Sequence, residues 1–467
     1  MNNVDWKNIS GTAYDWKTTL KPERPYIHDY TKTLTYKLYL ASVNETLDGT
    51  DVITTFEKAL EQIIAIDKMT EGMPKIVYLV GWQFFGHDSK YPAWNCVNEA
   101  LKRKQDKTAY DSLLWIMNEG YKYNTTVSLH INIKDAYMDS PLWKEYEEND
   151  LLSKEENGSF TKGGYWGNQQ SYIVSYKKEW DTGFLKKRID ELCEFLPIQK
   201  AGTIHIDAMD ARHDPGHGFT LEMGQESRNK IVRYWRELGI DVTSEFLYYE
   251  TPDWRERVEQ LVGLMPLAYV FSQNLEDYIA RPASLICGVK SSKRFKEGIS
   301  DQMGNLFGQS FLVQNICMKK ELRDTAWKDV FFRGFCLNEV RYKYLNTLER
   351  THAVVTKDTI EAHFSDGVVT YLNGDIVKNG IFVQTSDFIA IPAVYRNSKS
   401  YFVYGINHGE YEIDMGKAYG LEKDMRLKFY DYNTDGISNT YTCESLNDGK
   451  LKIHLEENQA YLIEIAE

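Results

Sequence analysis

Apolar and polar positions alternate in two distinct rhythms along most of the chain. Between about residues 55 and 350, short apolar runs typical of buried strands alternate with segments whose apolar residues recur at helical spacing. The strand-like runs include KIVYLVGW (75–82), TTVSLHIN (125–132), AGTIHIDAMD (201–210) and IDVTSEF (240–246). The helical segments include FEKALEQIIAIDKM (56–69), AYDSLLWIMNEGYKY (109–123), FLKKRIDELCEFL (184–196) and ESRNKIVRYWRELG (226–239). Repeated strand-then-helix units predict a parallel sheet, and the length of this region fits a (β/α)8 TIM-type barrel.

The rhythm changes after about residue 352, where short alternating strands follow one another to the end of the chain. Turn signals separate them, among them the tripeptides SDG, NGD, TDG and NDG. We therefore expect an α/β protein in three parts. An N-terminal segment over residues 1–54 packs on the barrel, the barrel covers residues 55–351, and an antiparallel β-sandwich covers residues 352–467. A long loop is expected after the strand at 125–132.

Composition and charge restrict the class of partner. The formal net charge of −13 disfavours nucleic acid, because phosphates are bound by clustered Lys and Arg. The 32 tyrosines and 11 tryptophans favour carbohydrate, since exposed aromatic rings stack on sugar faces. No stretch approaches the roughly 20 apolar residues of a membrane span, and the first residues, MNNVDWKNISGTAYDWK, lack the apolar core of a signal peptide. We expect a cytoplasmic protein without a membrane partner, or a secreted one whose leader was removed.

The cysteines give no sign of a metal site or of a disulfide framework. They are Cys96, Cys193, Cys287, Cys317, Cys336 and Cys443. No CxxC pair occurs among them. Because free cysteine packs as a small hydrophobe, we expect buried thiols in a reducing compartment. The sequence predicts no cofactor and no bound metal, and it leaves the oligomeric state open.

Polar residues follow four of the strand-like runs, at the end where (β/α)8 barrels carry their active sites. They are His87 and Asp88, His130 and Asn132, Asp207 and Asp210, and Glu245. Asp207 and Glu245 stand on consecutive strands, which lie about 4.8 Å apart in a sheet. Two such carboxylates suit a glycosidase, in which one attacks the anomeric carbon and the other protonates the leaving oxygen. Their separation is about 5–5.5 Å in retaining enzymes and wider in inverting ones.

Other interpretations of these residues stay open. Acidic residues at strand ends also cap loops or pair with Lys and Arg. A metal-dependent hydrolase or isomerase would use the ligand types in HIDAMDARHDPGHG, although the HxH pair of amidohydrolases is absent. Those ligand types are His205, Asp207, Asp210, His213, Asp214 and His217. A non-catalytic carbohydrate-binding protein would also explain the aromatic surplus, and four aromatic residues suit either a core or a sugar subsite: Trp82, Phe84, Trp94 and Trp143.

Four segments resemble, in order, those of one enzyme family. GHDSKYP (86–92) resembles the GHDSGHP-type segment, and HINIKDAYMDS (130–140) the HVNxxExYPE-type segment, of the endo-α-N-acetylgalactosaminidases of glycoside hydrolase family 101. GGYWGNQQSYIVSY (163–176) is similar to a Trp-containing stretch of that family. IHIDAMD and DVTSEF resemble the strands that carry its nucleophile and its acid/base. The shorter α-N-acetylgalactosaminidases of family 129 are related to these enzymes.

The resemblance implies a (β/α)8 barrel followed by a β-sandwich, and retaining hydrolysis of α-linked N-acetylgalactosamine. By position, Asp207 corresponds to the nucleophile and Glu245 to the general acid/base. The residues expected to bind the substrate are His87, Asp88, His130, Asn132, Trp166, Gln170 and Asp210. Three residues depart from the family pattern: Ala208 and Met209 stand where Val-Trp is usual, and Phe246 follows Glu245 in place of Trp. These departures leave a related α-galactosyl-type sugar open as the substrate.

Overall fold

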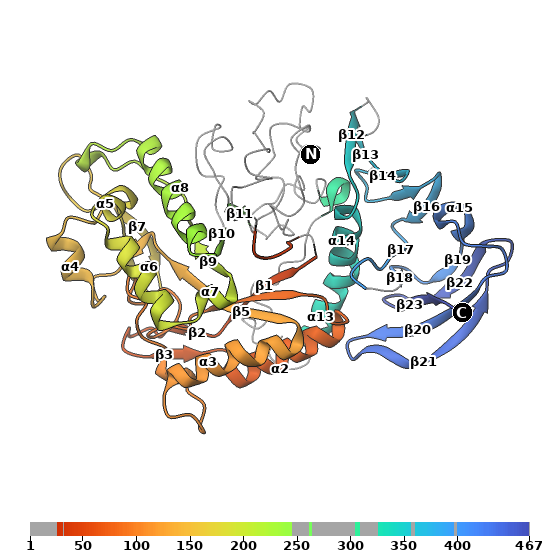
Figure 1. Ribbon diagram of the computed structural model, residues 1–467, viewed down its shortest axis with the longest axis horizontal. Helices are drawn as coiled ribbons and strands as arrows, with labels where there is room; N and C mark the ends of the chain where they lie inside the picture. Colours follow the sequence, from red (N-terminus) through yellow and green to blue (C-terminus); the bar gives the residue numbers. More distant parts are fainter. Residues whose placement is uncertain are drawn as a thin grey trace.

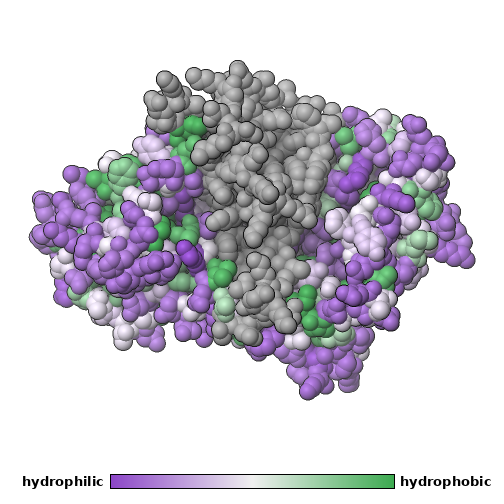
Figure 2. All heavy atoms as spheres, turned by 180° about the vertical axis from the view of Figure 1, so that it is seen from behind, coloured by the Kyte–Doolittle hydropathy of each residue, from purple (hydrophilic) through white to green (hydrophobic). Residues whose placement is uncertain are grey.

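The chain builds a parallel α/β part and an antiparallel β part, which lie side by side (Figure 1). The computed structural model describes residues 26–30, 32–244, 261–263, 304–308, 326–355, 360–396 and 399–466. Hydrophilic residues dominate the face of both parts that is seen in Figure 2. Within the described ranges, no helix has the length and apolar character that crossing a membrane requires.

A parallel sheet of six strands forms the centre of the first part, in the spatial order β1-β4-β5-β9-β10-β11. The strands are β1 (Leu34–Tyr39), β4 (Lys75–Val80), β5 (Thr125–Asn132), β9 (Thr203–Asp207), β10 (Asp241–Ser244) and β11 (Leu261–Gly263). The strands predicted from the four apolar runs are all present, with slightly different ends. Their order in space follows their order in the sequence, as in a (β/α)8 barrel. Closure of the sheet into eight strands stays a prediction.

Amphipathic helices connect these strands. They are α2 (Phe56–Met69), α3 (Ala109–Glu119), α6 (Phe184–Phe195) and α8 (Leu221–Glu237). Threonine side chains cap three of them at their first turn, with Thr55, Thr108 and Thr220 accepting a backbone N–H. Figure 1 shows α2 and α3 below the strands, and α6 and α8 on their left. All four helices were predicted from their apolar spacing.

The N-terminal segment differs from the expectation. We expected residues 1–54 to pack on the barrel, but β1 lies within that segment and is a strand of the sheet itself, paired in parallel with β4. Its sequence, LTYKLY, is buried along nearly its whole length. A lysine and two tyrosines interrupt the apolar run, which hid its strand character from the hydrophobic pattern.

The long loop expected after β5 contains ordered secondary structure. Short strands β6 (Asp135–Ala136), β8 (Gln169–Ile173) and β7 (Lys162–Trp166) form a small antiparallel sheet in that order. Helices α4 (Trp143–Glu148) and α5 (Tyr176–Asp181) flank it. A small core supports this subdomain and includes Tyr146, Leu151 and Val174. The polar, Gly-rich sequence of the hairpin gave no hydrophobic alternation from which to predict it.

The C-terminal part is antiparallel, as predicted, and begins with β12 at Arg350. Ten strands form one sheet in the order β12 (Arg350–Val355), β13 (Ile360–Phe364), β14 (Val368–Tyr371), β15 (Ile376–Lys378), β16 (Ile381–Gln384), β17 (Phe388–Pro392), β18 (Ser400–Gly405), β23 (Ala460–Ile465), β20 (Arg426–Asn433), β21 (Gly436–Ser445). A two-stranded antiparallel sheet of β19 (Gly409–Asp414) and β22 (Lys450–Leu455) forms a second layer. Val403, Phe429 and Ile453 share a core between the two layers.

A long helix lies between the two sheets (Figure 1). Helix α13 (Ala326–Gly334) continues through a π-helical segment, Phe335–Glu339, into α14 (Val340–Asn346). Phe331, Phe335 and Tyr344 of this helix belong to one hydrophobic core that includes residues of both sheets. Tyr432 on β20 also donates a hydrogen bond to the carbonyl of Met69 at 2.7 Å. The antiparallel part is therefore packed firmly against the parallel part.

Candidate active site

Two glycines let the loop after β4 lie directly against β2 (Ala41–Val43). A Cβ at Gly81 would come 2.0 Å from the carbonyl oxygen of Ala41, and one at Gly86 would come 2.7 Å from the same oxygen. Both glycines have a positive φ, which favours glycine for a second reason. The backbone N–H of His87 then donates to Ala41 O at 2.9 Å. This contact places His87 and Asp88 at the carboxyl end of the parallel sheet.

Four side chains that were predicted from sequence meet at this end, and we call them the central cluster: His87, Asp88, His130 and Asp207. Nε2 of His87 lies 3.4 Å from Oδ2 of Asp88, and Nε2 of His130 lies 3.6 Å from Oδ2 of Asp207. The two imidazole rings meet edge to face, with centroids 5.1 Å apart. His130 is buried, whereas Asp207 keeps 18% of its side chain exposed. A ligand can therefore reach the Asp207 carboxylate.

Polar side chains continue beneath the central cluster on the same face of the sheet. His205, two residues before Asp207, stacks on His130 with ring centroids 5.1 Å apart. Its Nδ1 lies 2.8 Å from the hydroxyl of Thr243 on β10. Tyr78 on β4 packs against His205, and its hydroxyl lies 2.6 Å from that of Thr203. Asp207, the candidate nucleophile, thus lies above a layer of buried polar side chains, and these side chains hold His130 and His205 in place.

The two carboxylates of the central cluster carry different pKa values. Burial alone would raise the pKa of Asp207, but the facing His130 and the charges of His87 and Lys37 outweigh burial and hold that pKa well below its usual range. Burial, opposed by His87 and reinforced by Asp207, raises the pKa of Asp88 to about 6. Asp207 is therefore ionised at every physiological pH, and Asp88 becomes ionised only near neutrality.

Two histidines beside Asp207, His130 and His205, are neutral. Burial, together with the charge of Lys37, lowers the pKa of His130 to about 4 and that of His205 well below its usual range. A neutral imidazole has one N–H donor and one acceptor nitrogen. His130 can therefore donate to the Asp207 carboxylate without adding a second positive charge to the site.

Asn132 organises the turn after β5. Its Oδ1 accepts the backbone N–H groups of Lys134 and Asp135, both at 2.8 Å, and its Nδ2 donates to the Asp135 carboxylate at 2.9 Å. Asn132 also pairs with Asp207 in the register of β5 and β9. Its amide is thus engaged in holding Asp135 beside the central cluster, and direct sugar contact by Asn132 stays a prediction.

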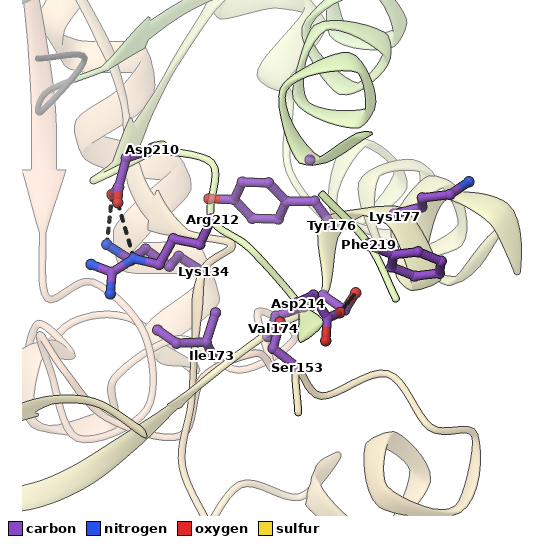
Figure 3. A pocket seen from close by; sticks show the side chains of 12 residues that line it. Lys134, Ser153, Ile173, Val174, Tyr176, Lys177, Asp210, Arg212, Asp214 and Phe219 are labelled. Atoms are coloured by element: carbon purple, nitrogen blue, oxygen red, sulfur yellow. Dashed lines mark hydrogen bonds and ion pairs between the residues drawn. The ribbon is translucent and has the colours of Figure 1, made fainter. Parts of the chain in front are cut away.

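Asp210 lies in an adjoining pocket, shown in Figure 3. Its buried carboxylate accepts from Lys134 Nζ at 2.6 Å and from Arg212 Nε at 3.1 Å (Figure 3). Asp214 lines the same pocket and accepts the backbone N–H of Lys154 at 2.9 Å. In this arrangement Asp210 neutralises Lys134, which lies in the turn after β5, the strand next to β9. Its predicted role in substrate binding stays a prediction.

The β7–β8 hairpin lies beside the central cluster. A Cβ at Gly167, in its turn, would come 2.5 Å from the backbone oxygen of Asp88. Trp166, next to that glycine, is 47% exposed, so much of its indole ring is open to a ligand. Nε2 of Gln170 donates to the carbonyls of Gly164 and Ser171 at 3.1 and 2.9 Å and so braces the hairpin. The hairpin forms one side of the site, with Trp166 as its exposed aromatic residue.

Two of the four ambiguous aromatic residues are core residues that also tie the loop to β5. The indole N–H of Trp82 donates to the carbonyl of His130 at 3.0 Å, and that of Trp94 donates to the carbonyl of Asn132 at 3.3 Å. Both side chains are buried. They position the strand end from beneath and leave no face for a sugar.

The metal ligands suggested by residues 205–217 do not converge. His205 faces Thr243, Asp210 pairs with Lys134, and Asp214 lies 2.9 Å from His217. These three carboxylate and imidazole groups therefore have separate partners. The segment offers no common set of donors for the metal-dependent alternative.

Elsewhere in the described ranges, ligand-type atoms come within 4.8 Å of one another in two groups. One consists of His87, His130 and Asp207, and the other is an exposed surface group of His408, His454 and Glu456. The first group is part of the central cluster, in which Asp207 is the candidate nucleophile.

Glu245, the predicted acid/base, lies outside the described residues. It follows Ser244, the last residue of β10, directly in the sequence. In the register of β9 and β10, Ser244 pairs with Ile206, the residue before Asp207. The described part of β10 therefore ends one residue before Glu245, on the strand that pairs with the strand of Asp207.

Sequence reasoning missed two charged residues near Asp207. Lys37 is buried within β1, where its charge acts on Asp207, and burial lowers its pKa to about 8. Asp135 is buried after β5, and burial raises its pKa. A signal existed for both: Lys37 is a charge inside an otherwise strand-like run, and Asp135 lies within the HINIKDAYMDS segment.

Comparison with known families and structures agrees with the four sequence motifs. Residues 48–253 match the family model described as Endo-alpha-N-acetylgalactosaminidase, which spans the central cluster and Glu245. The resemblance inferred from the motifs is thereby confirmed, and this stretch is a glycoside hydrolase domain. No curated protein sequence matches the chain significantly.

Solved structures of the α-N-acetylgalactosaminidase NagBb from Bifidobacterium bifidum have a similar fold. The ligand-free form is 14% identical, with a TM-score of 0.51, and the match covers 72% of this chain and 55% of that one. A quadruple mutant is 12% identical, with a TM-score of 0.52 and the same coverage. The complex with Gal-NHAc-DNJ is 12% identical, with a TM-score of 0.51, covering 74% and 57%. The match thus spans little more than half of the NagBb chain.

Proposed function

We propose that this chain, which carries a glycoside hydrolase domain of the endo-α-N-acetylgalactosaminidase type, is a retaining glycosidase. Its substrate would be α-linked N-acetylgalactosamine, or a related α-galactosyl-type sugar, on glycans or glycopeptides. We also propose that the parallel sheet closes into a (β/α)8 barrel. The sequential order of the six parallel strands supports closure.

The observation that carries the proposal is the state of Asp207. It is an accessible carboxylate at the carboxyl end of a central parallel strand, and its pKa lies well below the usual range. An attacking carboxylate must be ionised when the sugar binds. The neutral His130 beside it and the buried polar layer beneath it would hold the carboxylate in one orientation.

The proposed reaction has two steps. In the first, an oxygen of Asp207 bonds to the anomeric carbon as the glycosidic bond breaks, and Glu245 gives its proton to the leaving oxygen. In the second, Glu245 takes a proton from water, the water oxygen bonds to the anomeric carbon, and Asp207 is released. Two inversions at the anomeric carbon leave its configuration unchanged.

The remaining residues of the cluster would hold the sugar. Asp88 has a left-handed backbone conformation and projects from the loop after β4 next to His87. Near neutral pH its carboxylate would accept hydrogen bonds from sugar hydroxyls. The exposed ring of Trp166 would form the aromatic side of the pocket, and His87 and His130 would complete it.

Release of aryl leaving groups tests the proposal directly. We expect hydrolysis of aryl α-N-acetylgalactosaminide in preference to the α-galactoside, α-N-acetylglucosaminide and α-glucoside. NMR should show the α-anomer as the first product, because the mechanism retains configuration. A first product with β configuration would exclude the covalent route, and hydrolysis of only the glucosides would exclude the proposed sugar.

Protonation of Asp88 should cause the fall of kcat/KM at low pH, which is the acid limb of the pH profile. Its raised pKa means that the acceptor is protonated as the pH falls through about 6, so kcat/KM should fall tenfold per pH unit below that value. The variant Asp88→Asn should lose this limb and about 10- to 100-fold in kcat/KM, the range of a hydrogen bond to a charged group. Asp139→Asn is the matched control, because Asp139 pairs with Lys90 of the same loop at 2.7 Å. A limb that persists in Asp88→Asn would assign it to another group.

A further inference from the structure

The second group of converging ligand atoms, which we call the surface cluster, consists of His408, His454 and Glu456. One carboxylate joins the two imidazole rings: Oε2 of Glu456 lies 2.8 Å from Nδ1 of His408, and its Oε1 lies 3.1 Å from Nε2 of His454. The two rings meet edge to face, with centroids 4.9 Å apart. All three residues are exposed, so an ion from solvent can reach them.

The two-stranded sheet of β19 and β22 places these ligands on one face. Glu410 pairs with His454 in its register, and side chains alternate between faces along a strand. His408 precedes Glu410 by two residues and Glu456 follows His454 by two, so all four side chains share a face. The other face of β22 is buried. In Figure 1 this sheet lies at the right, apart from the strands that carry the central cluster.

Hydrogen bonds fix the backbone on both sides of the surface cluster. The N–H of Glu456 donates to Oε1 of Gln459 at 3.0 Å, and the N–H of Gln459 donates to the carbonyl of Glu456 at 3.2 Å. Asn407, the residue before His408, donates its N–H to the carbonyl of Asp387 at 3.0 Å and its Nδ2 to Oδ1 of Asp387 at 2.7 Å. The ligands therefore start from a fixed backbone, which reduces the entropy lost when an ion binds.

We propose that the surface cluster binds a transition-metal ion of the zinc class, with His408, His454 and Glu456 as its protein ligands and water in the fourth position. Imidazole nitrogen and carboxylate oxygen both bind zinc, and two histidines with one glutamate form an open tetrahedral site. With bonds of about 2.1 Å, ligand atoms in such a site lie about 3.4 Å apart. The separations of 2.8 and 3.1 Å are close to that value, and one ligand atom of each side chain lies within 4.8 Å of the other two. The sequence predicted no metal, because these ligands come from two strands that meet only in the fold.

Glu410 provides the partner that a metal-binding histidine needs on its other nitrogen. Its Oε1 lies 2.8 Å from Nδ1 of His454, on the side of the ring away from the proposed ion. A carboxylate in this position holds the proton on Nδ1 and leaves Nε2 free to bind the metal. Glu412 lies on the same face but pairs with Lys450 at 2.6 Å and Lys452 at 3.3 Å. Glu412→Gln is therefore the matched control for Glu410→Gln.

Another histidine of the antiparallel part provides a control for the ligands themselves. Nε2 of His363 lies 3.1 Å from Oε1 of Glu361, and its ring stacks on that of His352 with centroids 4.1 Å apart. These three side chains do not form one of the two converging groups found among the described residues. His363→Gln therefore removes a histidine that is paired with a glutamate without touching the surface cluster.

Calorimetric titration of chelator-treated protein with Zn²⁺ tests the site. The carboxylates of Glu456 and Glu410 raise the pKa of His454, so the ion competes with a proton and the titration is run at about pH 8. We expect one equivalent of Zn²⁺ to bind to the wild type at least tenfold more tightly than to His408→Gln or His454→Gln. Ca²⁺ should not compete, because it prefers oxygen ligands.

The partner and control variants refine this result. Glu410→Gln should weaken Zn²⁺ binding by about 10- to 100-fold, the usual effect of losing such a partner. Glu412→Gln and His363→Gln should leave the affinity unchanged. In NMR spectra, the ring signals of His408 and His454, assigned by their loss in the two histidine variants, should shift together as Zn²⁺ is added.

An unchanged Zn²⁺ affinity in both His408→Gln and His454→Gln would overturn the proposal and leave the surface cluster a set of ion pairs. An equal loss in His363→Gln would do the same, because the binding would then not be specific to these ligands. Asp207→Asn removes a ligand of the other converging group, so loss of the Zn²⁺ equivalent in that variant alone would move the ion to the central cluster and refute the surface site. None of these measurements needs turnover, so their outcome is independent of the proposed glycosidase function.

Discussion

Asp207→Asn is expected to abolish hydrolysis of every glycoside that the wild-type protein cleaves, with a loss of roughly four orders of magnitude or more in kcat, as for other nucleophile deletions. The amide keeps the shape of the side chain but cannot form the glycosyl ester with the anomeric carbon. Asp181→Asn is the matched control, because it makes the same change at an exposed position, the end of α5, where Asp181 pairs with Lys177 at 2.6 Å. Its loss should stay below about tenfold, since an exposed ion pair contributes little.

The same series tests Glu245. With Glu245→Gln, aryl glycosides with good leaving groups should keep much more activity than natural glycosides, because such groups need little protonation. A mechanism-based inactivator that carries the preferred sugar should attach to the peptide that contains Asp207. Attachment to another carboxylate, together with near-normal activity of Asp207→Asn, would move the nucleophile elsewhere and refute the assignment.

The fold was predictable from sequence where the hydrophobic period was regular. The run KIVYLV and the helix FEKALEQIIAIDKM have the spacing of a buried strand and of an amphipathic helix, and both lie where they were predicted. The strand at Leu34–Tyr39 was missed because Lys37 and two tyrosines interrupt its apolar run. The β7–β8 hairpin was missed because its Gly, Gln and Asn residues give no alternation of apolar and polar positions.

The candidate site was predictable from residues that follow strands, but their roles depend on distances that sequence does not contain. His87, Asp88, His130 and Asp207 come together because three parallel strands, β4, β5 and β9, end at one edge of the sheet. Asn132 and Asp210 lie at the same edge, yet their polar atoms are already bonded to Asp135 and Lys134. Contacts with residues from neighbouring strands and turns therefore decide which polar side chains remain available to bind a ligand.

The loop that carries His87 and Asp88 is anchored by a buried ion pair far along the sequence. Arg188 on α6 donates to one oxygen of Glu179 at 2.6 and 2.9 Å, and to the carbonyl of Pro92 at 2.6 Å. Its guanidinium lies 4.0 Å from the centroid of the Trp94 ring. Both Arg188 and Glu179 are buried. The pair therefore ties α5 and α6 to the end of the site loop.

Arg188→Met should destabilise the protein by about 3–5 kcal/mol, because it leaves Glu179 buried and without its cation. Chemical denaturation measures this loss, and the neighbouring variant Lys187→Met is the control. Lys187 is exposed, with Nζ 3.8 Å from Glu191, so its replacement should change stability by less than about 0.5 kcal/mol. The double variant Arg188→Met/Glu179→Gln should recover part of the loss, since the second change removes the unpaired charge.

The kcat/KM of Arg188→Met should also fall at temperatures where the variant is folded, because Pro92 and Trp94 lose the contact that fixes the loop. Full activity and stability in Arg188→Met would show that Trp82 and Trp94 hold the loop without the ion pair.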